Sequence, residues 1–430
     1  MLHVVSELYY PEDAATAHYM TGVAEHLARC WPVRVVCAKP KYNTQLRHLP
    51  KRERHNGVEI HRCWCTTFDK NHLLGRAINV VTASLSMLLA LLVSLRRGDR
   101  ALVVTNPPVL PFVVLLACRA RGASCCLRID DVYPEAMVHG GLIRPGATAA
   151  QLLNWMNRQL YRRMNQVVVL GRDMRRLVEQ KLGGPSGNLV VIPNWADLDI
   201  VAPAGRRGNK LLREYGLEDK FVVGYAGNIG RVQAVEVIVG AARQLKQARD
   251  IHFLFVGAGQ KLPWLRRAIE QGGLENVTLA GQRARAEQDE FLNACEVGVV
   301  SLALGMSGAG VPSRLYNLMA AGRPVIAVMD DDCEAAMVVR ENQIGWVVPP
   351  DDPQKIADAI VEARSDRQRL RELGARSRRA AEENYSRERV LAMYGALFQG
   401  VDAERGAAGS AGQATVEGQP REQPLPSELT

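Results

Sequence analysis

Two successive series of short apolar runs, each run followed by a helical pattern, constrain this 430-residue chain more than any other feature. In the first series, strand-like runs lie at 2–6, 33–38, 58–65, 101–105, 124–129, 166–170 and 189–192. In the second series, they lie at 221–225, 251–256, 277–280, 297–302, 325–328 and 345–348. Buried runs that alternate with helices are typical of parallel sheets with helices on both faces. The sequence therefore predicts an α/β protein with two doubly wound units, in a chain too long for one core.

Composition indicates where these units begin and end. The first unit is predicted to span residues 1–200 and the second residues 220–385. Residues 201–219 between them are polar and rich in Gly, Arg and Lys, which is typical of a linker. Residues 402–430 are small and polar with almost no large apolar side chain, so burial cannot offset the entropy of ordering them. We therefore predict a disordered tail at residues 402–430.

The cysteines and histidines argue against a metal site. The chain has nine cysteines, and none of them has the Cys-x-x-Cys spacing that is typical of zinc ligands. Cys63 and Cys65 alternate along a predicted strand, which indicates burial in the sheet rather than chemistry. Free thiols suit a reducing cytoplasm, and the first residues begin a strand directly instead of a secretory signal. We expect a cytoplasmic protein without a bound metal.

One helical segment, residues 77–95, is nearly long and apolar enough to span a bilayer. It is flanked by Arg76, Arg96 and Arg97, an arrangement common in membrane proteins. Polar residues interrupt the segment, however, and a predicted strand follows it at once. We therefore predict a core or interfacial helix, and a membrane-spanning helix is the alternative.

The formal net charge of +9 is concentrated in basic clusters of the first half, at residues 47–54, 158–163 and 172–176. Clusters of this kind suit nucleic acid or anionic lipid. No aromatic-rich platform for nucleic acid accompanies them, so no nucleic-acid partner is expected. Two interpretations remain, namely attraction to an anionic membrane surface and a face that is simply solvated.

Glycine-rich turns follow three predicted strands of the second unit. They read YAGNIGRVQ at 225–233, VGAGQK at 256–261 and LAGQR at 279–283. Glycines let backbone N–H groups approach an anion, and a helix N-terminus adds its positive dipole. Each turn alone also suits a tight connection with no ligand. A fourth loop, GVPSRLYNLMAAGRP at 310–324, also lies between two apolar runs, so all four are expected at the edge where open α/β sheets bind ligands.

The order and spacing of these motifs resemble the nucleotide-binding half of retaining GT-B glycosyltransferases of the sucrose-synthase-like family. In the first half, SELYYPEDAATAHYM, LRIDDVYPEAM and VVIPNWADLD resemble the bacterial branch that builds exopolysaccharide and O-antigen repeats, including colanic-acid and fucosamine transferases. The resemblance covers almost the whole chain before the tail. It implies an α/β GT-B fold of two Rossmann-like doubly wound domains that face each other across a cleft. Residues 386–401 are then a helix that crosses back to the first domain.

The resemblance also implies the reaction. It indicates a retaining hexosyltransferase that moves a hexose or amino-hexose from a nucleoside-diphosphate sugar to a lipid-linked or saccharide acceptor, in exopolysaccharide and lipopolysaccharide biosynthesis. Helix N-termini and basic side chains serve the diphosphate in this fold, so no cofactor or metal is expected beyond the donor substrate. Together with the apolar helix and the basic clusters, the resemblance predicts a peripheral protein on the inner face of the cytoplasmic membrane, next to a lipid-linked saccharide acceptor.

Aligning the chain with the family motifs places the donor site in the four loops of the second domain. The predicted donor-binding residues are Gly227, Asn228, Gly230, Arg231, Gln233, Gly257, Lys261, Gln282, Gly310, Val311, Pro312, Ser313, Arg314 and Asn317. The Arg and Lys that the family carries in the first phosphate loop are replaced by Asn228 and Gln233. Arg231, Lys261 or Arg314 is therefore expected to neutralise the diphosphate.

Two carboxylates of the family are also replaced. Relatives carry two Glu around the sugar-nucleotide loop, and Ala309 and Asn317 stand at those places. Asn317 is expected to bond a ribose hydroxyl, or else to cap a helix or face solvent. Ala309 supplies only backbone, so the N–H groups of Gly310 and Val311 are expected to contribute more to donor binding.

Two adjacent carboxylates, Asp130 and Asp131, end a predicted strand where the resemblance puts the catalytic acid. Asp131 is expected to position the acceptor hydroxyl and, second, to accept its proton, because the leaving phosphate takes that proton in retaining relatives. Alternatively, Asp131 caps the helix after Pro134. Further cleft residues are predicted at Tyr10, Glu12, Thr16 and Asn194, and simple packing of Trp195 is the alternative for the last motif.

Two other functions are compatible with this fold. A catalytically silent GT-B partner protein accounts for the missing carboxylates, and a non-hydrolysing sugar-nucleotide epimerase has the same architecture. Nucleotide binding without transfer indicates the first, and product formed without an acceptor indicates the second.

Overall fold

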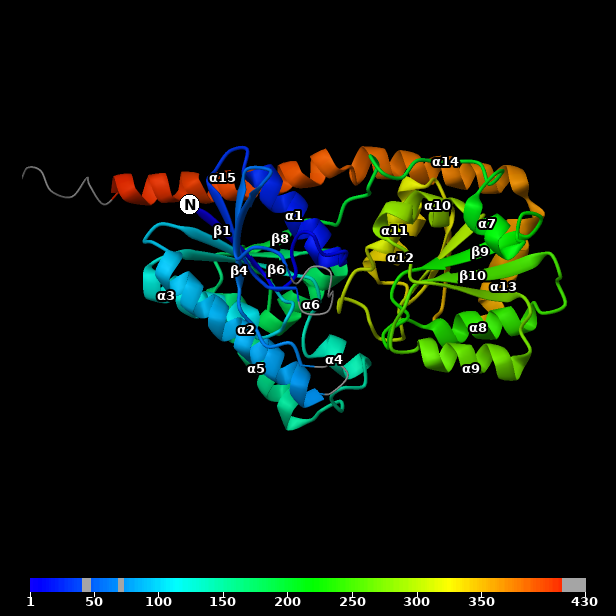
Figure 1. The fold of residues 1–430 in the computed structure, drawn as a ribbon, viewed down its shortest axis with the longest axis horizontal. Helices are drawn as coiled ribbons and strands as arrows, with labels where there is room; N and C mark the ends of the chain where they lie inside the picture. The colour runs from blue at the N-terminus through cyan, green and yellow to red at the C-terminus, as the bar shows by residue number, and fades with distance from the viewer. Residues whose placement is uncertain (41–47, 69–72, 412–430) are drawn as a thin grey trace, which may run out of the picture.

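The structure, a computed structural model, describes residues 1–40, 48–68 and 73–411, with side chains as far as residue 400. Two α/β halves lie side by side, and the C-terminal helices run along both of them (Figure 1). The first sheet has the spatial order β3 (Arg52–His55), β4 (Val58–Cys63), β2 (Val33–Ala38), β1 (Leu2–Ser6), β5 (Arg100–Val104), β6 (Ser124–Ile129), β7 (Gln166–Val169), β8 (Leu189–Val191). The second sheet has the order β11 (Val277–Gly281), β10 (Ile251–Val256), β9 (Phe221–Ala226), β12 (Val297–Ser301), β13 (Val325–Val328), β14 (Gly345–Val348).

Among the described residues, every pair of neighbouring strands is parallel except β3 with β4. Strands such as β1, β6 and β10 are buried along their whole length, which explains why they read as unbroken apolar runs. The predicted pair of doubly wound, mostly parallel sheets is confirmed. β3 was not predicted, because its residues are all polar.

Helices cover both faces of the first sheet. One face carries α1 (Ala15–Leu27) and α15 (Arg387–Ala411). The other face carries α2 (Leu73–Ser94), α3 (Leu110–Arg121), α5 (Thr148–Arg163) and α6 (Arg172–Leu182), and the short α4 (Glu135–His139) follows β6. Each face therefore has its own apolar core, as a parallel sheet requires.

The second sheet is covered in the same way. One face carries α7 (Lys210–Tyr215), α10 (Gln288–Asn293), α11 (Arg314–Ala320), α12 (Glu334–Glu341) and α14 (Arg367–Asn384). The other face carries α8 (Val235–Gln244), α9 (Leu262–Gly272) and α13 (Pro353–Ser365), and a 3₁₀ turn at Arg285–Glu287 precedes α10. Residues 201–219, predicted as a linker, contain α7, whose Leu211 and Leu212 are buried in the second half.

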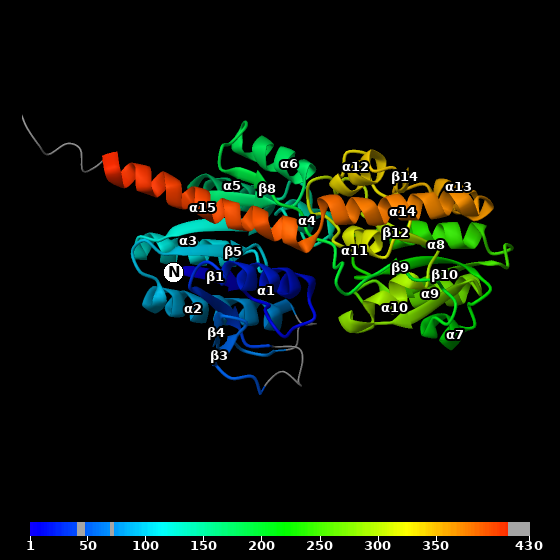
Figure 2. The same cartoon turned by 90° about the horizontal axis from the view of Figure 1, so that it is seen from above.

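The last helix ties the two halves together. A bridge between Ala196 and Ser386 marks the crossing, and α15 then lies along α1 (Figure 2). Tyr394 and Phe398 of α15 are fully buried in the core of the first half. The helix runs to Ala411, beyond residue 402 where the sequence predicted disorder, and residues 412–430 of that predicted tail lie outside the described part.

α2 is the helix, within the described residues, that is long and apolar enough to cross a membrane by length and composition. Core helices of soluble proteins pass the same test. Here the inner residues Met87 and Leu91 are buried against the sheet, whereas Val81, Leu85 and Val93 on the outer side are exposed. α2 therefore combines a core face with an unusually apolar outer face.

Candidate active site between the two halves

The glycine turns of the second sheet meet at its carboxyl edge, because the strands that carry them are parallel neighbours. A cavity of about 430 Å³ opens there, between the second half and the start of α1. It is lined by Ala226, Gly227, Asn228, Val256, Gly257, Ala258, Gln282, Arg283, Arg285, Gln288, Phe291, Leu292, Ser313, Arg314 and Asn317, together with Asp13 and Ala15 of the first half. Seven predicted donor-binding residues are thus brought together: Gly227, Asn228, Gly257, Gln282, Ser313, Arg314 and Asn317.

Two of the glycine turns interlock through their backbones. The N–H of Gly227 donates to the carbonyl of Val256, and that of Ile229 donates to Ala258, both at 2.8 Å. A Cβ atom added to Gly257 would lie 1.9 Å from the Gly227 oxygen, and the φ angle of Gly257 is +146°. Only glycine tolerates both conditions. The floor of the cavity therefore depends on this residue type.

Arg314 brings a positive charge into the cavity. Its guanidinium carbon lies 4.7 Å from the centre of the Tyr225 ring, and its Nη2 donates to the carbonyl of Asn228 at 3.4 Å. Its Nη1 is buried and has no hydrogen-bond partner among the described residues. A guanidinium placed in this way retains the capacity to bind an anion.

The two positions of the missing carboxylates differ in their surroundings. Asn317 lines the cavity, and its side-chain oxygen is buried without a hydrogen-bond partner in the described part of the chain. Ala309 is fully buried, and its carbonyl accepts the N–H of Val132 from the first half at 2.8 Å. Asn317 therefore still offers an acceptor to a ligand, whereas Ala309 serves the contact between the halves.

Asp130 and Asp131 end β6 in different environments. Asp130 accepts hydrogen bonds from Arg128 at 2.8 Å and from Thr16 at 3.4 Å. Asp131 forms a backbone bridge with Gly310 of the second half, and the residue as a whole is exposed, although a Cβ atom added to Gly310 would lie 3.1 Å from its Oδ1. Desolvation by the surrounding protein, and then the charge of Asp130, raise the pKa of Asp131 to about 7. A carboxyl group that titrates near neutral pH at a cleft suits acid–base or positioning work.

Comparisons with known proteins agree with this geometry. Residues 220–366 match the family model described as "Glycosyl transferases group 1", and residues 15–195 match a "Glycosyl transferase 4-like domain". The chain is 33% identical to "Probable glycosyltransferase WbjE" of Pseudomonas aeruginosa over 319 residues, which cover 74% of this chain and 78% of that protein. The chain belongs to the group 1 glycosyltransferases. The predicted glycosyltransferase activity is thereby confirmed at the level of the family.

A second relative and two solved structures extend the likeness. "Putative colanic acid biosynthesis glycosyl transferase WcaI" of Escherichia coli K12 is 27% identical over 73% of this chain and 79% of its own length. Sucrose-phosphate synthase of Thermosynechococcus elongatus superposes with a TM-score of 0.77 at 16% identity, covering 94% of this chain and 99% of that one. HepE of Anabaena, solved with UDP-glucose, gives 0.72 at 15% identity, covering 93% and 99%. These structures confirm the predicted GT-B fold.

Other predicted donor residues of this group 1 glycosyltransferase lie near the cavity but do not line it: Gly230, Arg231, Gln233, Lys261, Gly310, Val311 and Pro312. Lys261 forms an ion pair with Glu236 at 2.5 Å. Arg231 donates to Gln260 at 2.8 Å. These partners, Glu236 and Gln260, do not line the cavity, and of the three predicted cations it is Arg314 that does.

A buried arginine connects the predicted cleft residues of the first half. Arg128 donates to Asp130, to Asn194 at 2.7 Å and to the Tyr394 hydroxyl at 2.8 Å. Thr16 reaches the same group through Asp130. Asn194 is thus a structural partner of Arg128, which belongs to the core between β6 and α15.

The other two predicted cleft residues, Tyr10 and Glu12, make different contacts from those of the group around Arg128. Tyr10 stacks on His55 with ring centres 3.9 Å apart, and Glu12 donates its N–H to the Tyr9 carbonyl. The neighbouring Asp13 lines the donor cavity instead. Trp195 is fully buried and packs edge-on against Tyr19. This agrees with the alternative interpretation, in which Trp195 has a packing role.

Besides Asp13, sequence reasoning missed three polar residues that the second half contributes to the cavity, Arg283, Arg285 and Gln288. Arg283 donates to Glu214 at 2.6 Å. Arg285 forms an ion pair across the cleft with Asp197, a buried residue that also accepts from His18 of α1 at 2.8 Å. Only the position of Arg283 at the end of the LAGQR motif signalled such a role, since the following turn carries no motif.

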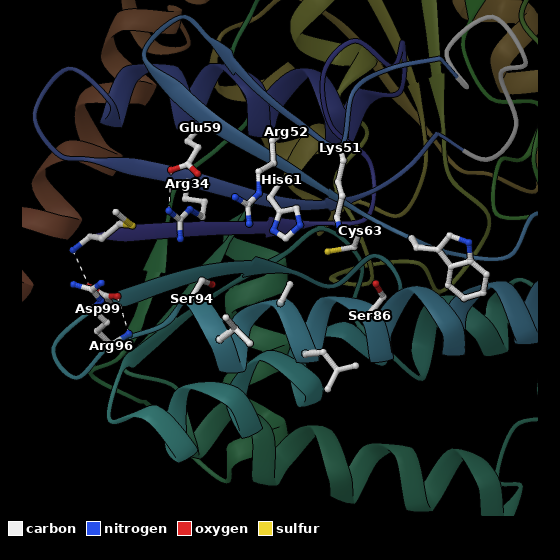
Figure 3. A pocket seen from close by; sticks show the side chains of 15 residues that line it. Arg34, Lys51, Arg52, Glu59, His61, Cys63, Ser86, Ser94, Arg96 and Asp99 are labelled. Atoms are coloured by element: carbon white, nitrogen blue, oxygen red, sulfur yellow. Dashed lines mark hydrogen bonds and ion pairs between the residues drawn. The ribbon is translucent and has the colours of Figure 1, made fainter.

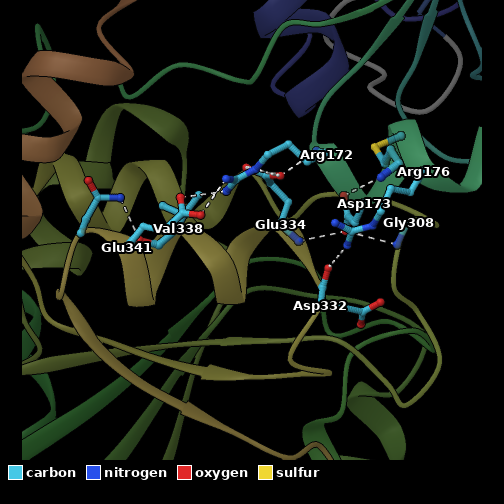
Figure 4. A network of polar contacts seen from close by, with 10 residues as sticks. Arg172, Asp173, Arg176, Gly308, Asp332, Glu334, Val338 and Glu341 are labelled. Atoms are coloured by element: carbon cyan, nitrogen blue, oxygen red, sulfur yellow. Dashed lines mark hydrogen bonds and ion pairs between the residues drawn. The ribbon is translucent and has the colours of Figure 1, made fainter. Parts of the chain in front are cut away.

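A polar network joins α6 of the first half to α12 of the second half (Figure 4). Arg172 pairs with Glu334 at 3.0 Å and with Glu341 at 2.7 Å. Asp173 accepts the N–H groups of Gly308 at 3.1 Å and of Glu334 at 2.9 Å. Arg172 of the basic cluster at 172–176 therefore contacts the other half, and attraction of this cluster to a membrane surface stays a prediction.

Proposed function

We propose that this group 1 glycosyltransferase moves a hexose or amino-hexose from a nucleoside-diphosphate sugar, with retention of anomeric configuration, to a lipid-linked or saccharide acceptor in cell-surface polysaccharide biosynthesis. One observation carries the donor assignment. Within the part of the chain that the structure describes, Arg314 Nη1 and Asn317 Oδ1 are both buried without hydrogen-bond partners, and both residues line the same cavity. Unsatisfied buried polar atoms are costly, and a ligand that pairs with both removes that cost.

The proposed roles follow from charge and position. Arg314 neutralises the diphosphate, whose negative charge grows as the glycosidic bond breaks. Asn317 accepts a hydrogen bond from a ribose hydroxyl. Asp131, at the opposite side of the cleft, orients the acceptor hydroxyl and only secondarily accepts its proton. The UDP-glucose complex of the similarly folded HepE supports a nucleotide sugar as donor.

The proposed acceptor side is the first half of the molecule, at the inner face of the cytoplasmic membrane. The exposed apolar residues of α2, among them Val81, Leu85 and Val93, support this orientation. Amphipathic helices of this kind lie in the interface plane and bind through apolar burial and attraction to anionic lipids. The WcaI relative, by its printed name, acts in colanic acid biosynthesis, which supports a polysaccharide pathway.

The donor assignment is tested by thermal-shift measurements with UDP and GDP sugars on the wild type and on matched variants. Arg314→Gln should abolish the shift that the best donor gives, whereas Arg231→Gln removes a cation outside the cavity and should retain it. Thermal unfolding curves without ligand show whether either substitution lowers the stability of the fold. Loss of the shift in Arg231→Gln alone would reverse the assignment of the diphosphate cation.

A catalytically silent partner protein is the second candidate, because both family carboxylates are absent at Ala309 and Asn317. The two candidates differ in one measurement. A transferase converts the donor that it binds when membranes with lipid-linked saccharide are added. Nucleotide-sugar binding without transfer or hydrolysis in that mixture would favour the silent partner.

A further inference from the structure

A second cavity, of about 710 Å³, lies on the first half of the molecule (Figure 3). It is a groove between α2 and the strands β3 and β4, at the edge of the eight-stranded sheet, and we call it the α2 groove. Lys51 and Arg52 are among the residues that line its strand side, and Leu89 and Val93 are among those that line its helix side. Among the described residues, none lines both this groove and the donor cavity. The donor chemistry therefore does not account for it.

The strand side of the α2 groove is basic. Arg34 is paired with Glu59 at 2.9 Å. The side chains of Lys51, Arg52 and Arg96 have no ion pair or hydrogen bond within the described part of the chain. Among the described residues, these three positive charges of the groove therefore have no carboxylate paired with them.

Two neighbouring titratable residues, His61 and Asp99, do not change this excess positive charge. Burial, and then the charges of Arg52 and Lys51, lower the pKa of His61, so its imidazole is neutral at neutral pH. Asp99 already accepts the amino group of Met1 and the backbone N–H of Arg96, both at 2.9 Å. The groove thus favours an anionic ligand.

The helix side of the α2 groove is apolar and open to solvent. Leu89 and Val93 are 58% and 85% exposed, and Trp64 at the strand end is 63% exposed. Leu85 and Val81 continue the same stripe along α2, since residues four apart share one face of a helix. Contact with hydrocarbon would remove this apolar surface from water.

We propose that the α2 groove binds one phosphate-bearing membrane lipid, with its phosphate among Lys51, Arg52 and Arg96 and its hydrocarbon chain against Leu89 and Val93. A free phosphate leaves the apolar wall in water, and an uncharged lipid leaves three cations uncompensated. Only an amphipathic anion both pairs with the cations of the strand side and removes the apolar helix side from water. This lipid site deepens the proposed membrane side of the protein and rests on it, but it needs neither donor binding nor transfer.

A short-chain phosphatidic acid, used below its micelle concentration, tests the site without a membrane surface. We expect saturable one-to-one binding by calorimetry, about tenfold tighter than the binding of inorganic phosphate because of the added hydrocarbon. Short-chain phosphatidylcholine should not saturate the site, since its choline group cancels the phosphate charge. Phosphatidic acid that binds no tighter than inorganic phosphate, or equally tight phosphatidylcholine, contradicts the proposal.

Matched variants locate the binding. Lys51→Glu/Arg52→Glu should weaken phosphatidic acid binding about tenfold or more. Arg266→Glu/Arg267→Glu changes the net charge equally at two exposed residues of α9 and should bind like the wild type. Leu89→Ser/Val93→Ser should lower the affinity for phosphatidic acid to that for inorganic phosphate. Equal binding by the two charge-reversed proteins, with unchanged thermal unfolding, overturns the site.

The same samples separate this site from the donor site. Thermal shifts with UDP and GDP sugars should be unchanged in Lys51→Glu/Arg52→Glu, because its residues lie outside the donor cavity. A wild-type protein that binds phosphatidic acid but no nucleotide sugar contradicts the proposed transferase function and supports the lipid site. The opposite result supports the transferase and contradicts the lipid site.

Discussion

The donor cavity lies between the two halves and is built from interlocked backbone turns and buried polar atoms, whereas the α2 groove lies on one half and is built from exposed side chains. At Gly257 and Asn317, a single atom out of place leaves a clash or an unsatisfied group. At Lys51 and Arg52, water and salt screen each charge. Changes in the cavity should therefore act steeply, and changes in the groove should be graded and sensitive to salt.

The largest effect is expected from Gly257→Ala. Its new Cβ would lie 1.9 Å from the Gly227 oxygen, so the two turns cannot keep their positions. We expect a loss of about 3 kcal/mol or more in the free energy of unfolding and loss of nucleotide binding. Urea denaturation and calorimetry measure the two effects.

Gly281→Ala is the control for the backbone strain in that change. Gly281 also has a positive φ angle, of +72°, but no atom of the described residues lies within 4 Å of its added Cβ. It should cost only about 1 kcal/mol. Equal losses in the two variants would show that the interlocked turns are not essential.

The next effect concerns the transfer step. Asp131→Asn should lower the turnover of donor and acceptor about hundredfold, while nucleotide affinity changes little, because Asp131 faces the acceptor side of the cleft. Steady-state transfer and calorimetry give the two numbers. Turnover that survives intact would make Asp131 a structural residue.

Asp131→Asn should also change how the stability of the protein depends on pH. Desolvation, and then the charge of Asp130, raise the pKa of Asp131 from its ordinary value of 3.8 to about 7, so ionisation destabilises the folded protein as pH rises between these values. Asp131→Asn should be as stable as the wild type near pH 4 and more stable near pH 8. Because Asp131 is an exposed residue and solvent screens its charge, we expect a gain of only about 1 kcal/mol. A stability difference that is independent of pH would contradict the shift.

Asn317→Ala should weaken nucleotide binding about tenfold, since it removes an acceptor that has no partner among the described residues. Asn317→Asp keeps an acceptor oxygen at the same place and should bind more tightly than the alanine variant. Calorimetry with the preferred nucleoside diphosphate provides both affinities. Unchanged affinity in Asn317→Ala would remove the ribose assignment.

The smallest expected effect is a difference between the two sites in how strongly salt weakens ligand binding. Raising the ionic strength should weaken phosphatidic acid binding about fivefold, because Lys51, Arg52 and Arg96 are accessible to screening ions. Nucleotide binding at the partly enclosed cavity should change less. Equal salt dependence at the two sites would erase the contrast between an enclosed and an exposed site.

Features that depend on local periodicity were predictable from the sequence. The strands at Ser124–Ile129, Ile251–Val256 and Val325–Val328 have the predicted bounds, because a strand buried on both faces must be apolar throughout. The glycine turns were found for a similar reason, since a backbone that approaches another so closely excludes a Cβ atom. β3 escaped prediction because an edge strand with exposed polar residues shows no apolar pattern.

Features that depend on which side chains meet were not predictable. The sequence offered Arg231, Lys261 and Arg314 as equal candidates, and only the structure pairs Lys261 with Glu236 and leaves Arg314 in the cavity. Arg285 was missed because its partner, Asp197, is distant in the chain. The basic cluster at 172–176 suggested a membrane surface, yet Arg172 meets two glutamates of α12.

The sequence alone determined that two parallel sheets form and that glycine turns gather at the edge of the second sheet, because burial and backbone sterics act between neighbours in the chain. The tertiary structure decided which cation enters the donor cavity, which residues join the two halves, and that β3, β4 and α2 enclose a basic and apolar groove. Those outcomes depend on distances between segments far apart in the sequence, and only packing of the complete fold sets such distances.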